Sequence, residues 1–144
     1  RFFAHSGFDA EAWQDAMEHN LAKGRFIYGG STISQQTVKN MFFSPSRNPL
    51  RKWHEIIFTY SMEGHLRKRR IIELYLNIAE FGRGIYGVEA ASRHYFHKPV
   101  SEITVDEAIE LAATLPGPVN HNPASRTRFF QRHKRTVARH YAAQ

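Results

Sequence analysis

Apolar residues recur three and four positions apart along this chain of 144 residues, and this spacing constrains the fold more than any other feature. Ile72, Tyr75, Leu76 and Ala79 follow the i, i+3, i+4, i+7 order that places side chains on one face of an α-helix. The alternation that a half-buried strand requires is weak and confined to residues 26–28. The sequence therefore predicts an all-α fold.

Capping residues and prolines divide the chain into successive helices. Asp9 and Ser31 are expected to cap the first two helices, since their side-chain oxygens can accept hydrogen bonds from free backbone N–H groups. Pro49 suits the first turn of a third helix over about residues 51–64. The Thr-x-x-Glu pattern at residues 104–107 is typical of a capping box and predicts a further helix. A basic helix is expected to close the chain.

The charge balance narrows the classes of partner. Twenty Lys and Arg residues face thirteen Asp and Glu residues, which gives a net charge of +7. This excess favours an anionic partner such as nucleic acid, anionic lipid or a phosphorylated substrate. No acid follows Glu110, whereas six cations do. The absence of cysteine excludes disulfides, thiolate zinc sites and cysteine nucleophiles, and no stretch approaches the roughly 18 apolar residues of a membrane span.

The polar segment 29–40 is the first candidate site. Two glycines permit close approach of a ligand to the backbone, and the helix that follows offers N–H groups to an anion. Ser31, Gln35 and Lys39 share one face at spacing four. The alternative is a capped helix whose polar residues face solvent.

A carboxylate among cations forms the second candidate site. Glu55 follows Arg51 and Lys52 and precedes the apolar run 56–58. A glutamate at the edge of an apolar wall suits a general acid or base, or a metal ligand. The alternative is an i, i+4 surface pair between Arg51 and Glu55.

Four cations at residues 67–70 precede the apolar stripe of the fourth helix. They suit phosphate or an anionic membrane, and the alternative is a solvated helix start. Because cations are unfavourable at a helix N-terminus, we expect an anionic group nearby. His94 and His97 lack the carboxylate that would complete a zinc set, so a histidine metal site is not favoured.

Taken in order, these segments resemble the motifs of glycosyltransferase family 51, the peptidoglycan polymerases. The matched positions are Phe2, His5 and Gly7; residues 29–40; Arg51, Lys52 and Glu55; residues 68–77; and, more loosely, residues 115–116 and 122–123. Residues 77–82 and 87–91 are similar to the monofunctional branch, the biosynthetic transglycosylases. The resemblance covers residues 1–144, interpreted as a single domain truncated at its N-terminus.

The resemblance implies a lysozyme-like helical fold with two lobes and a cleft. It implies polymerisation of lipid II into glycan strands, with inversion and release of undecaprenyl pyrophosphate. The expected partners are lipid II, the lipid-linked glycan and the cell-wall synthesis machinery, without nucleic acid. The expected location is the periplasmic face of the bacterial inner membrane, with an anchoring transmembrane helix upstream of Arg1.

The resemblance also assigns roles to individual residues. Glu55 is the catalytic candidate and the candidate ligand of a divalent metal, Mg or Mn. Lys39 and Arg47 would neutralise the pyrophosphate leaving group. The full set of predicted substrate-binding residues is His5, Ser31, Thr32, Gln36, Lys39, Arg47, Arg51, Lys52, Lys68 and Asn122.

The principal catalytic glutamate of the family belongs to its first motif and would lie three residues before Arg1. The chain of 144 residues is therefore expected to have impaired activity, since loss of a general base typically costs roughly 10²–10⁴-fold. Two alternatives remain open. One is a lysozyme-like hydrolase, which lacks a phosphate leaving group. The other is a basic membrane- or nucleic-acid-binding scaffold module without catalysis.

Overall fold

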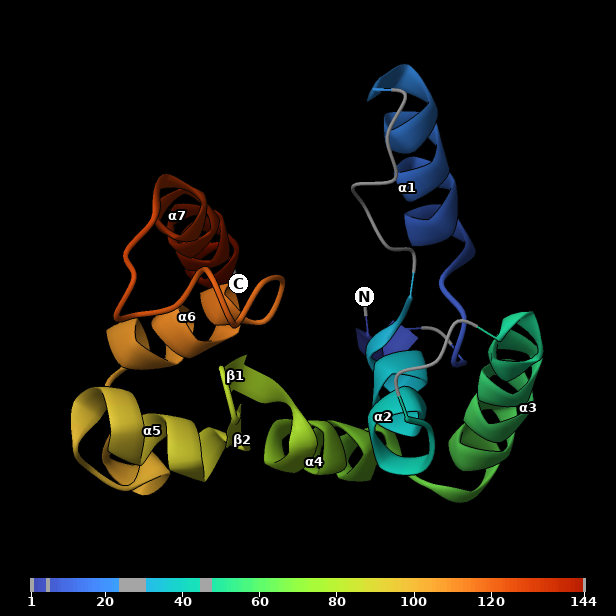
Figure 1. Ribbon diagram of the computed structural model, residues 1–144, viewed down its shortest axis with the longest axis horizontal. Coiled ribbons are helices and arrows are strands. Elements are labelled where there is room, and N and C mark those ends of the chain that lie inside the picture. Colours follow the sequence, from blue (N-terminus) through green and yellow to red (C-terminus); the bar gives the residue numbers. More distant parts are fainter. Residues whose placement is uncertain (1, 5, 24–30, 45–47, 144) are drawn as a thin grey trace. The chain divides into compact units, whose positions relative to one another are not determined.

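The computed structural model describes residues 2–4, 6–23, 31–44 and 48–143, which form two compact units (Figure 1). The first unit comprises residues 1–75 and the second residues 76–144. The elements in chain order are η1 (Phe2–Ala4), α1 (Ala10–Lys23), α2 (Ile33–Phe42), α3 (Pro49–His65), α4 (Lys68–Ile78), β1 (Glu80–Gly82), β2 (Ile85–Tyr86), α5 (Val88–Phe96), η2 (Val100–Glu102), α6 (Val105–Thr114) and α7 (Arg128–Ala142). His5, Arg47 and the weak strand pattern at residues 26–28 lie outside the described residues. The predicted helical character is confirmed.

In the first unit, α2 packs against α3. The buried apolar residues described there are only Val38, Ile71 and Tyr75. Polar side chains fill most of the remaining buried positions: Asn20, Thr32, Ser34, Gln35, Thr37, Glu55 and Thr59. The alternative, that the polar residues of the second helix face solvent, is wrong for Ser34, Gln35 and Thr37. These side chains point into the unit because α2 supplies the face that α3 covers.

The start of α2 differs by one residue from the prediction. Thr32, not Ser31, is the N-cap, and it forms a capping box with Gln35. The Thr32 side chain accepts from the Gln35 N–H, while the Gln35 side-chain oxygen accepts from the Thr32 N–H. Two adjacent hydroxyl residues make either a plausible cap, and Gln35 decides because a capping box places its Gln or Glu three residues after the cap.

Two other predicted helix starts, those of α3 and α6, are confirmed. Asn48 caps α3 by accepting from the Leu50 N–H, and Pro49 occupies the first turn. Thr104 and Glu107 form the expected capping box at α6.

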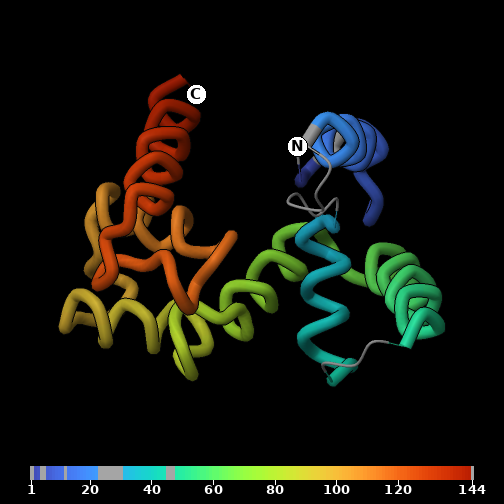
Figure 2. Tube along the Cα trace, turned by 45° about the horizontal axis from the view of Figure 1, so that its top comes forward, coloured from blue at the N-terminus to red at the C-terminus, as the bar shows by residue number. Residues whose placement is uncertain are grey.

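The second unit has an apolar core to which α5, α6, α7 and β1 contribute. Figure 2 shows the backbone of this unit, coloured from yellow-green to red. Its buried apolar members are Ala79, Phe81, Ala91, Ile109, Leu111, Ala113 and Phe130. Phe130 is fully buried and fixes the inner face of α7. Thr127 caps that helix through the Phe130 N–H.

A short antiparallel hairpin, β1–β2, is the one departure from the all-helical prediction in the described chain. Its strands are three and two residues long, too short to show alternation. Gly87 ends the hairpin at φ 86° and ψ 147°, a region that essentially only glycine adopts. A Cβ atom there would lie 2.7 Å from the carbonyl oxygen of Asn77. Among the described helices, none is long and apolar enough to cross a bilayer.

Candidate functional site

Glu55 is buried in the first unit, with two cations against its carboxylate. The Nε atom of Arg51 lies 3.2 Å from Oε1, and the Nζ atom of Lys52 lies 3.3 Å from Oε2. The side chain of Glu55 is 4% exposed, whereas that of Lys52 is 53% exposed. The predicted i, i+4 pair therefore exists, but it joins a buried carboxylate to partly exposed cations. A surface pair is consequently the wrong description of Glu55.

One carboxylate oxygen of Glu55 is not satisfied. Although Arg51 is close, Oε1 accepts no hydrogen bond from any described residue. A buried polar atom without a partner is costly unless a ligand or another group pairs with it. Oε1 of Glu55 therefore has the charge of Arg51 beside it and capacity to accept a further hydrogen bond.

Lys52 links this carboxylate to the start of α2. Its Nζ atom also lies 3.3 Å from the Ser31 hydroxyl oxygen, to which it donates. Gln36 reaches the same place, since its Nε2 atom donates to the carbonyl oxygen of Ser31. The structure thus brings together Ser31, Gln36, Lys52 and Glu55, with Arg51 beside them.

Tyr75 holds Gln36 from the opposite side. Its hydroxyl donates to Oε1 of Gln36 at 3.3 Å. Burial raises the pKa of the Tyr75 hydroxyl, so the group stays protonated and remains a donor at neutral pH. Tyr75 was matched by sequence resemblance without a role of its own, and the structure assigns it the positioning of Gln36.

Lys39 on α2 and Thr32, the N-cap of that helix, differ in whether their polar groups are available to a ligand. Lys39 is exposed and has no carboxylate partner among the described residues, so its ammonium group is available to an anion. Thr32 is buried, and its hydroxyl hydrogen is already donated to the carbonyl oxygen of Gly7 at 2.6 Å. Thr32 therefore organises the start of the helix, while a role in substrate binding remains a prediction.

A second carboxylate with little exposure, that of Glu63, was not singled out from the sequence. It accepts hydrogen bonds from the Ser34 hydroxyl and from the Nζ atom of Lys68, the latter at 2.6 Å. The ammonium of Lys68 also lies 4.6 Å from the centroid of the Phe2 ring. Glu63 is the anionic group expected near residues 67–70. Because it neutralises Lys68, that lysine is less available to a phosphate than Lys39.

A spacing signal could have identified Glu63. Glu55, Thr59 and Glu63 follow one another at spacing four on α3, which places three polar side chains on one face. Thr59 is buried and donates its hydroxyl to the carbonyl oxygen of Glu55. Polar side chains that share one buried helix face indicate a buried polar network.

Asn122 belongs to the second unit. Its Oδ1 atom accepts from the N–H groups of Ala124 and Ser125, and its Nδ2 atom donates to the carbonyl oxygen of Pro118. The side chain thus shapes the loop before α7. Its predicted role in substrate binding stays a prediction.

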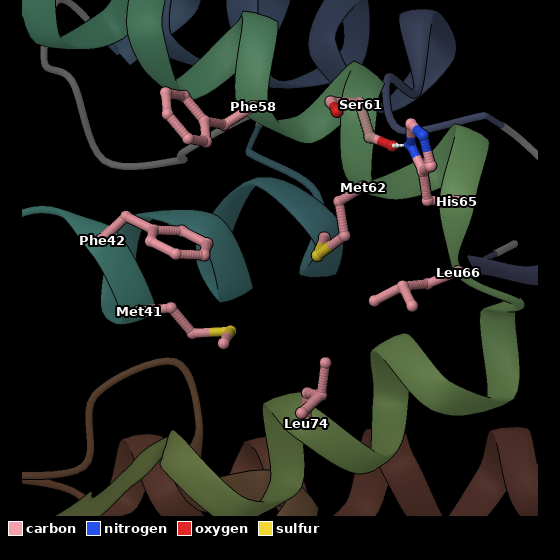
Figure 3. Close-up of a pocket in the computed structure, with 8 residues that line it drawn as sticks. All are labelled: Met41, Phe42, Phe58, Ser61, Met62, His65, Leu66 and Leu74. Carbon is pink, nitrogen blue, oxygen red and sulfur yellow. Dashed lines mark hydrogen bonds between the residues drawn. The ribbon is translucent and has the colours of Figure 1, made fainter.

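An apolar hollow of about 250 Å³ lies between α2, α3 and α4 of the first unit (Figure 3). It is lined by Met41, Phe42, Phe58, Ser61, Met62, His65, Leu66 and Leu74. The Nδ1 atom of His65 is hydrogen-bonded to the backbone carbonyl oxygen of Ser61 one turn earlier on the same helix. The hollow suits apolar contacts, and none of the predicted site residues lines it.

The divalent metal expected at Glu55 lacks a preformed set of ligands. Within the described ranges, no three His, Asp or Glu side chains are grouped so as to hold a metal ion. Two cations already flank Glu55, and they would repel a further cation. Any metal ion would have to take most of its ligands from elsewhere.

The comparison with protein families identifies the class. A family model described as transglycosylase matches residues 1–142. The chain belongs to this family, which confirms the resemblance found in its motifs.

Curated relatives agree with that assignment, and among them are three proteins named biosynthetic peptidoglycan transglycosylase. The protein of Laribacter hongkongensis is 49% identical over 118 residues, covering 82% of this chain and 52% of the relative. That of Thiobacillus denitrificans is 46% identical over 132 residues, covering 92% of this chain and 57% of the relative. That of Chromobacterium violaceum is 45% identical over 139 residues, covering 92% of this chain and 61% of the relative. The chain spans a little more than half the length of these relatives.

Proposed function

We propose that this protein is a peptidoglycan glycosyltransferase that polymerises lipid II into glycan strands and releases undecaprenyl pyrophosphate. The observation that carries the proposal is the cluster of Glu55, Arg51, Lys52 and Ser31, in a chain whose family makes such strands. The names of its relatives support the same activity.

The cations of the first unit suit a pyrophosphate leaving group. Departure of the lipid pyrophosphate develops negative charge, and fixed cations lower the barrier by stabilising it. Lys39 has no described carboxylate partner, and Lys52 exposes half of its side chain, so both can reach a substrate. Arg51 supports Glu55 from the other side, and Gln36 and Ser31 offer hydrogen bonds to sugar or phosphate oxygens.

We assign Glu55 an electrostatic role. Its carboxylate holds the two cations in place and keeps the cluster from carrying a large excess of positive charge. The proton of the acceptor hydroxyl would pass to the glutamate of the family's first motif, in a lysozyme-like fold with two lobes and a cleft. Mg²⁺ or Mn²⁺ would find one ligand at Glu55 and the rest on water and the pyrophosphate, since Mg²⁺ is typically bound by one or two carboxylates plus substrate phosphates.

The setting proposed for this activity is the periplasmic face of the bacterial inner membrane. The donor and acceptor are both lipid-linked, so polymerisation requires a protein held at that surface. The cell-wall synthesis machinery supplies its partners.

The decisive experiment follows labelled lipid II on a gel. The chain of 144 residues is compared with the same chain extended upstream by the Glu-Asp segment of the family's first motif. Ladders from the extended chain alone support the transferase and assign the base to that segment. Ladders from both mean that a carboxylate within residues 1–144 suffices. Binding of lipid II without ladders supports the scaffold, and no binding contradicts the proposal.

A second variant tests the leaving-group role of Lys39. Lys39→Ala should weaken binding of a pyrophosphate-bearing lipid more than binding of a plain glycan, because only the former presents the anion. Arg69→Ala, which removes another exposed cation of the first unit, is the matched control and should change neither. Equal weakening of both ligands by Lys39→Ala would remove Lys39 from the leaving-group site.

A further inference from the structure

Four arginines form a straight stripe on the outer face of α7. Arg128, Arg132, Arg135 and Arg139 are all exposed, at spacing i, i+4, i+7 and i+11. At 100° per residue they fall within an arc of about 60°, over a length of about 17 Å. Among the described residues no carboxylate pairs with them, and the nearest polar partner is the Thr136 hydroxyl, 3.5 Å from Nη2 of Arg139. We call these four residues the arginine stripe.

On the opposite face of α7, the cation Lys134 is paired with a carboxylate. The Nζ atom of Lys134 lies 2.7 Å from Oε1 of the buried Glu110 on α6, and Nη2 of Arg126 lies 3.8 Å from the same oxygen. Phe130, four residues before Lys134 on the same helix, is fully buried. The inner face is therefore anchored by an ion pair and an aromatic ring, and this anchoring fixes the arginine stripe outward.

The stripe is unfavourable for the isolated helix. Cations at spacing three and four repel one another, and Arg128 stands at the helix N-terminus, where the dipole is positive and no acidic residue lies in the first turn. An anionic surface would relieve this repulsion. Guanidinium groups stay charged at every physiological pH, so the stripe is a permanent feature of the protein.

We propose that the arginine stripe is a docking surface for the headgroups of an anionic phospholipid bilayer. Charge complementarity carries the proposal: a straight row of permanent cations matches a plane of lipid phosphates. Proteins that bind single-stranded nucleic acid add aromatic platforms to their basic grooves, and no aromatic side chain lies within the arc of the stripe. The helix would lie on the surface through its charges, without insertion of an apolar face.

The test measures binding of the 144-residue chain to vesicles free of lipid II. One set is phosphatidylcholine alone, and the other contains about one-third phosphatidylglycerol, which gives a negative surface potential. The unmodified chain should bind the anionic vesicles in low salt, bind the neutral ones weakly, and lose its preference in high salt. Each cation near the surface contributes about fivefold in affinity, so R128Q/R132Q/R135Q/R139Q should bind at least about 100-fold more weakly.

A matched variant separates a localised surface from bulk charge. R69Q/R70Q/R83Q/R93Q removes four exposed arginines spread over α4, the hairpin and α5, and changes the net charge equally. It should retain most of the binding. Equal losses in both variants would overturn the proposal, as would binding that survives high salt or is absent in the unmodified chain.

Two further readings complete the test. The thermal midpoint of the stripe variant should equal or exceed that of the unmodified chain, because the repulsion between the arginines is removed. A lower midpoint would mean that binding is lost through unfolding. In that case single Arg→Gln variants must each show a partial loss of binding, or the proposal fails. A stripe-dependent preference for an oligonucleotide over the anionic vesicles would overturn it. Since no lipid II is present, failure here leaves the proposed transferase untouched.

Discussion

The two units of this protein bury different kinds of side chain. In the first unit, seven of the ten described buried residues outside glycine and proline are polar or charged, whereas in the second unit seven of eleven are apolar. The two buried glutamates show the same contrast. Glu110 forms an ion pair with Lys134 at 2.7 Å, whereas Oε1 of Glu55 accepts no hydrogen bond from a described residue.

This difference separates a unit whose buried positions are mostly polar from a unit with an apolar core. Buried polar groups contribute little net stability, but they fix side-chain positions when their hydrogen bonds are made. The first unit accordingly holds the candidate site. The second holds most of the buried hydrocarbon, which is the main source of folding free energy.

The largest expected effect is on the apolar core of the second unit. Phe130→Ala should lower the free energy of unfolding by about 3–5 kcal/mol, because it removes a fully buried ring and leaves a cavity. Urea denaturation followed by circular dichroism measures it. Phe129→Ala, which truncates a partly exposed neighbour, should cost far less. A loss below about 1 kcal/mol for Phe130→Ala would contradict the description of this core.

The next effect concerns the polar network of the first unit. Glu63→Gln should lower the free energy of unfolding by about 2 kcal/mol, since Lys68 loses its charged partner while Ser34 keeps an acceptor. Glu73→Gln is the matched control, because Glu73 and Arg70 are both more than half exposed and should change stability by less than about 0.5 kcal/mol. Equal effects from the two substitutions would mean that the buried network adds nothing.

Glu55→Gln tests the role of Glu55 in polymerisation. We expect polymerisation of lipid II by the extended chain to fall more than tenfold, equivalent to more than about 1.4 kcal/mol in the barrier. The variant should remain folded at the assay temperature, as circular dichroism checks, although its thermal midpoint should fall because Arg51 and Lys52 lose their charged partner. Turnover equal to that of the unmodified chain would remove Glu55 from the mechanism.

A glycine within α3 offers a smaller, stabilising change. Gly64→Ala should raise the free energy of unfolding by about 0.5 kcal/mol, because alanine favours the helix and the added Cβ meets nothing within 4 Å. Thermal unfolding measures the gain. If the midpoint falls instead, the end of α3 is not the regular helix described.

The smallest effect is a pH dependence in the second unit. Burial lowers the pKa of His133, so the folded protein binds its proton less readily than the unfolded chain does. Above the unfolded pKa of about 6.5, His133 is neutral in both states and does not affect stability. As the pH drops through that value, the unfolded chain takes up the proton first, so the free energy of unfolding falls. His133→Gln should flatten the stability profile just below pH 6.5, and denaturation curves at several pH values check this. If the variant shows the same change of stability with pH as the unmodified chain, another group causes that pH dependence.

Local signals predicted the helices well, because they act within a few residues. Pro49 and the Thr104 capping box marked helix starts that the structure confirms. The β1–β2 hairpin was missed because strands of two or three residues carry no periodicity. Ser31 was predicted as the cap in place of Thr32 because both carry hydroxyl groups, although the spacing from Thr32 to Gln35 is that of a capping box.

The candidate site was less accessible to sequence reasoning, because burial depends on packing between distant segments. Residue spacing predicted the pair of Arg51 and Glu55, but not that Glu55 is buried. The expected anion near residues 67–70 could be inferred from the helix dipole, whereas its identity as Glu63 required the contact between α3 and α4. The resemblance assigned Lys39 to the leaving group and counted Lys68 among the substrate-binding residues, and only the structure shows that Lys68 is already neutralised by Glu63.

Gly87 has a consequence for the tolerance of this protein to genetic variation. Every amino-acid replacement at this position adds a Cβ atom against the backbone of Asn77, and that oxygen cannot rotate away as a side chain would. No missense change is therefore conservative there, however small or polar the new residue. In a library of random variants selected for folding, position 87 should be nearly depleted of substitutions, while position 64 should accept many.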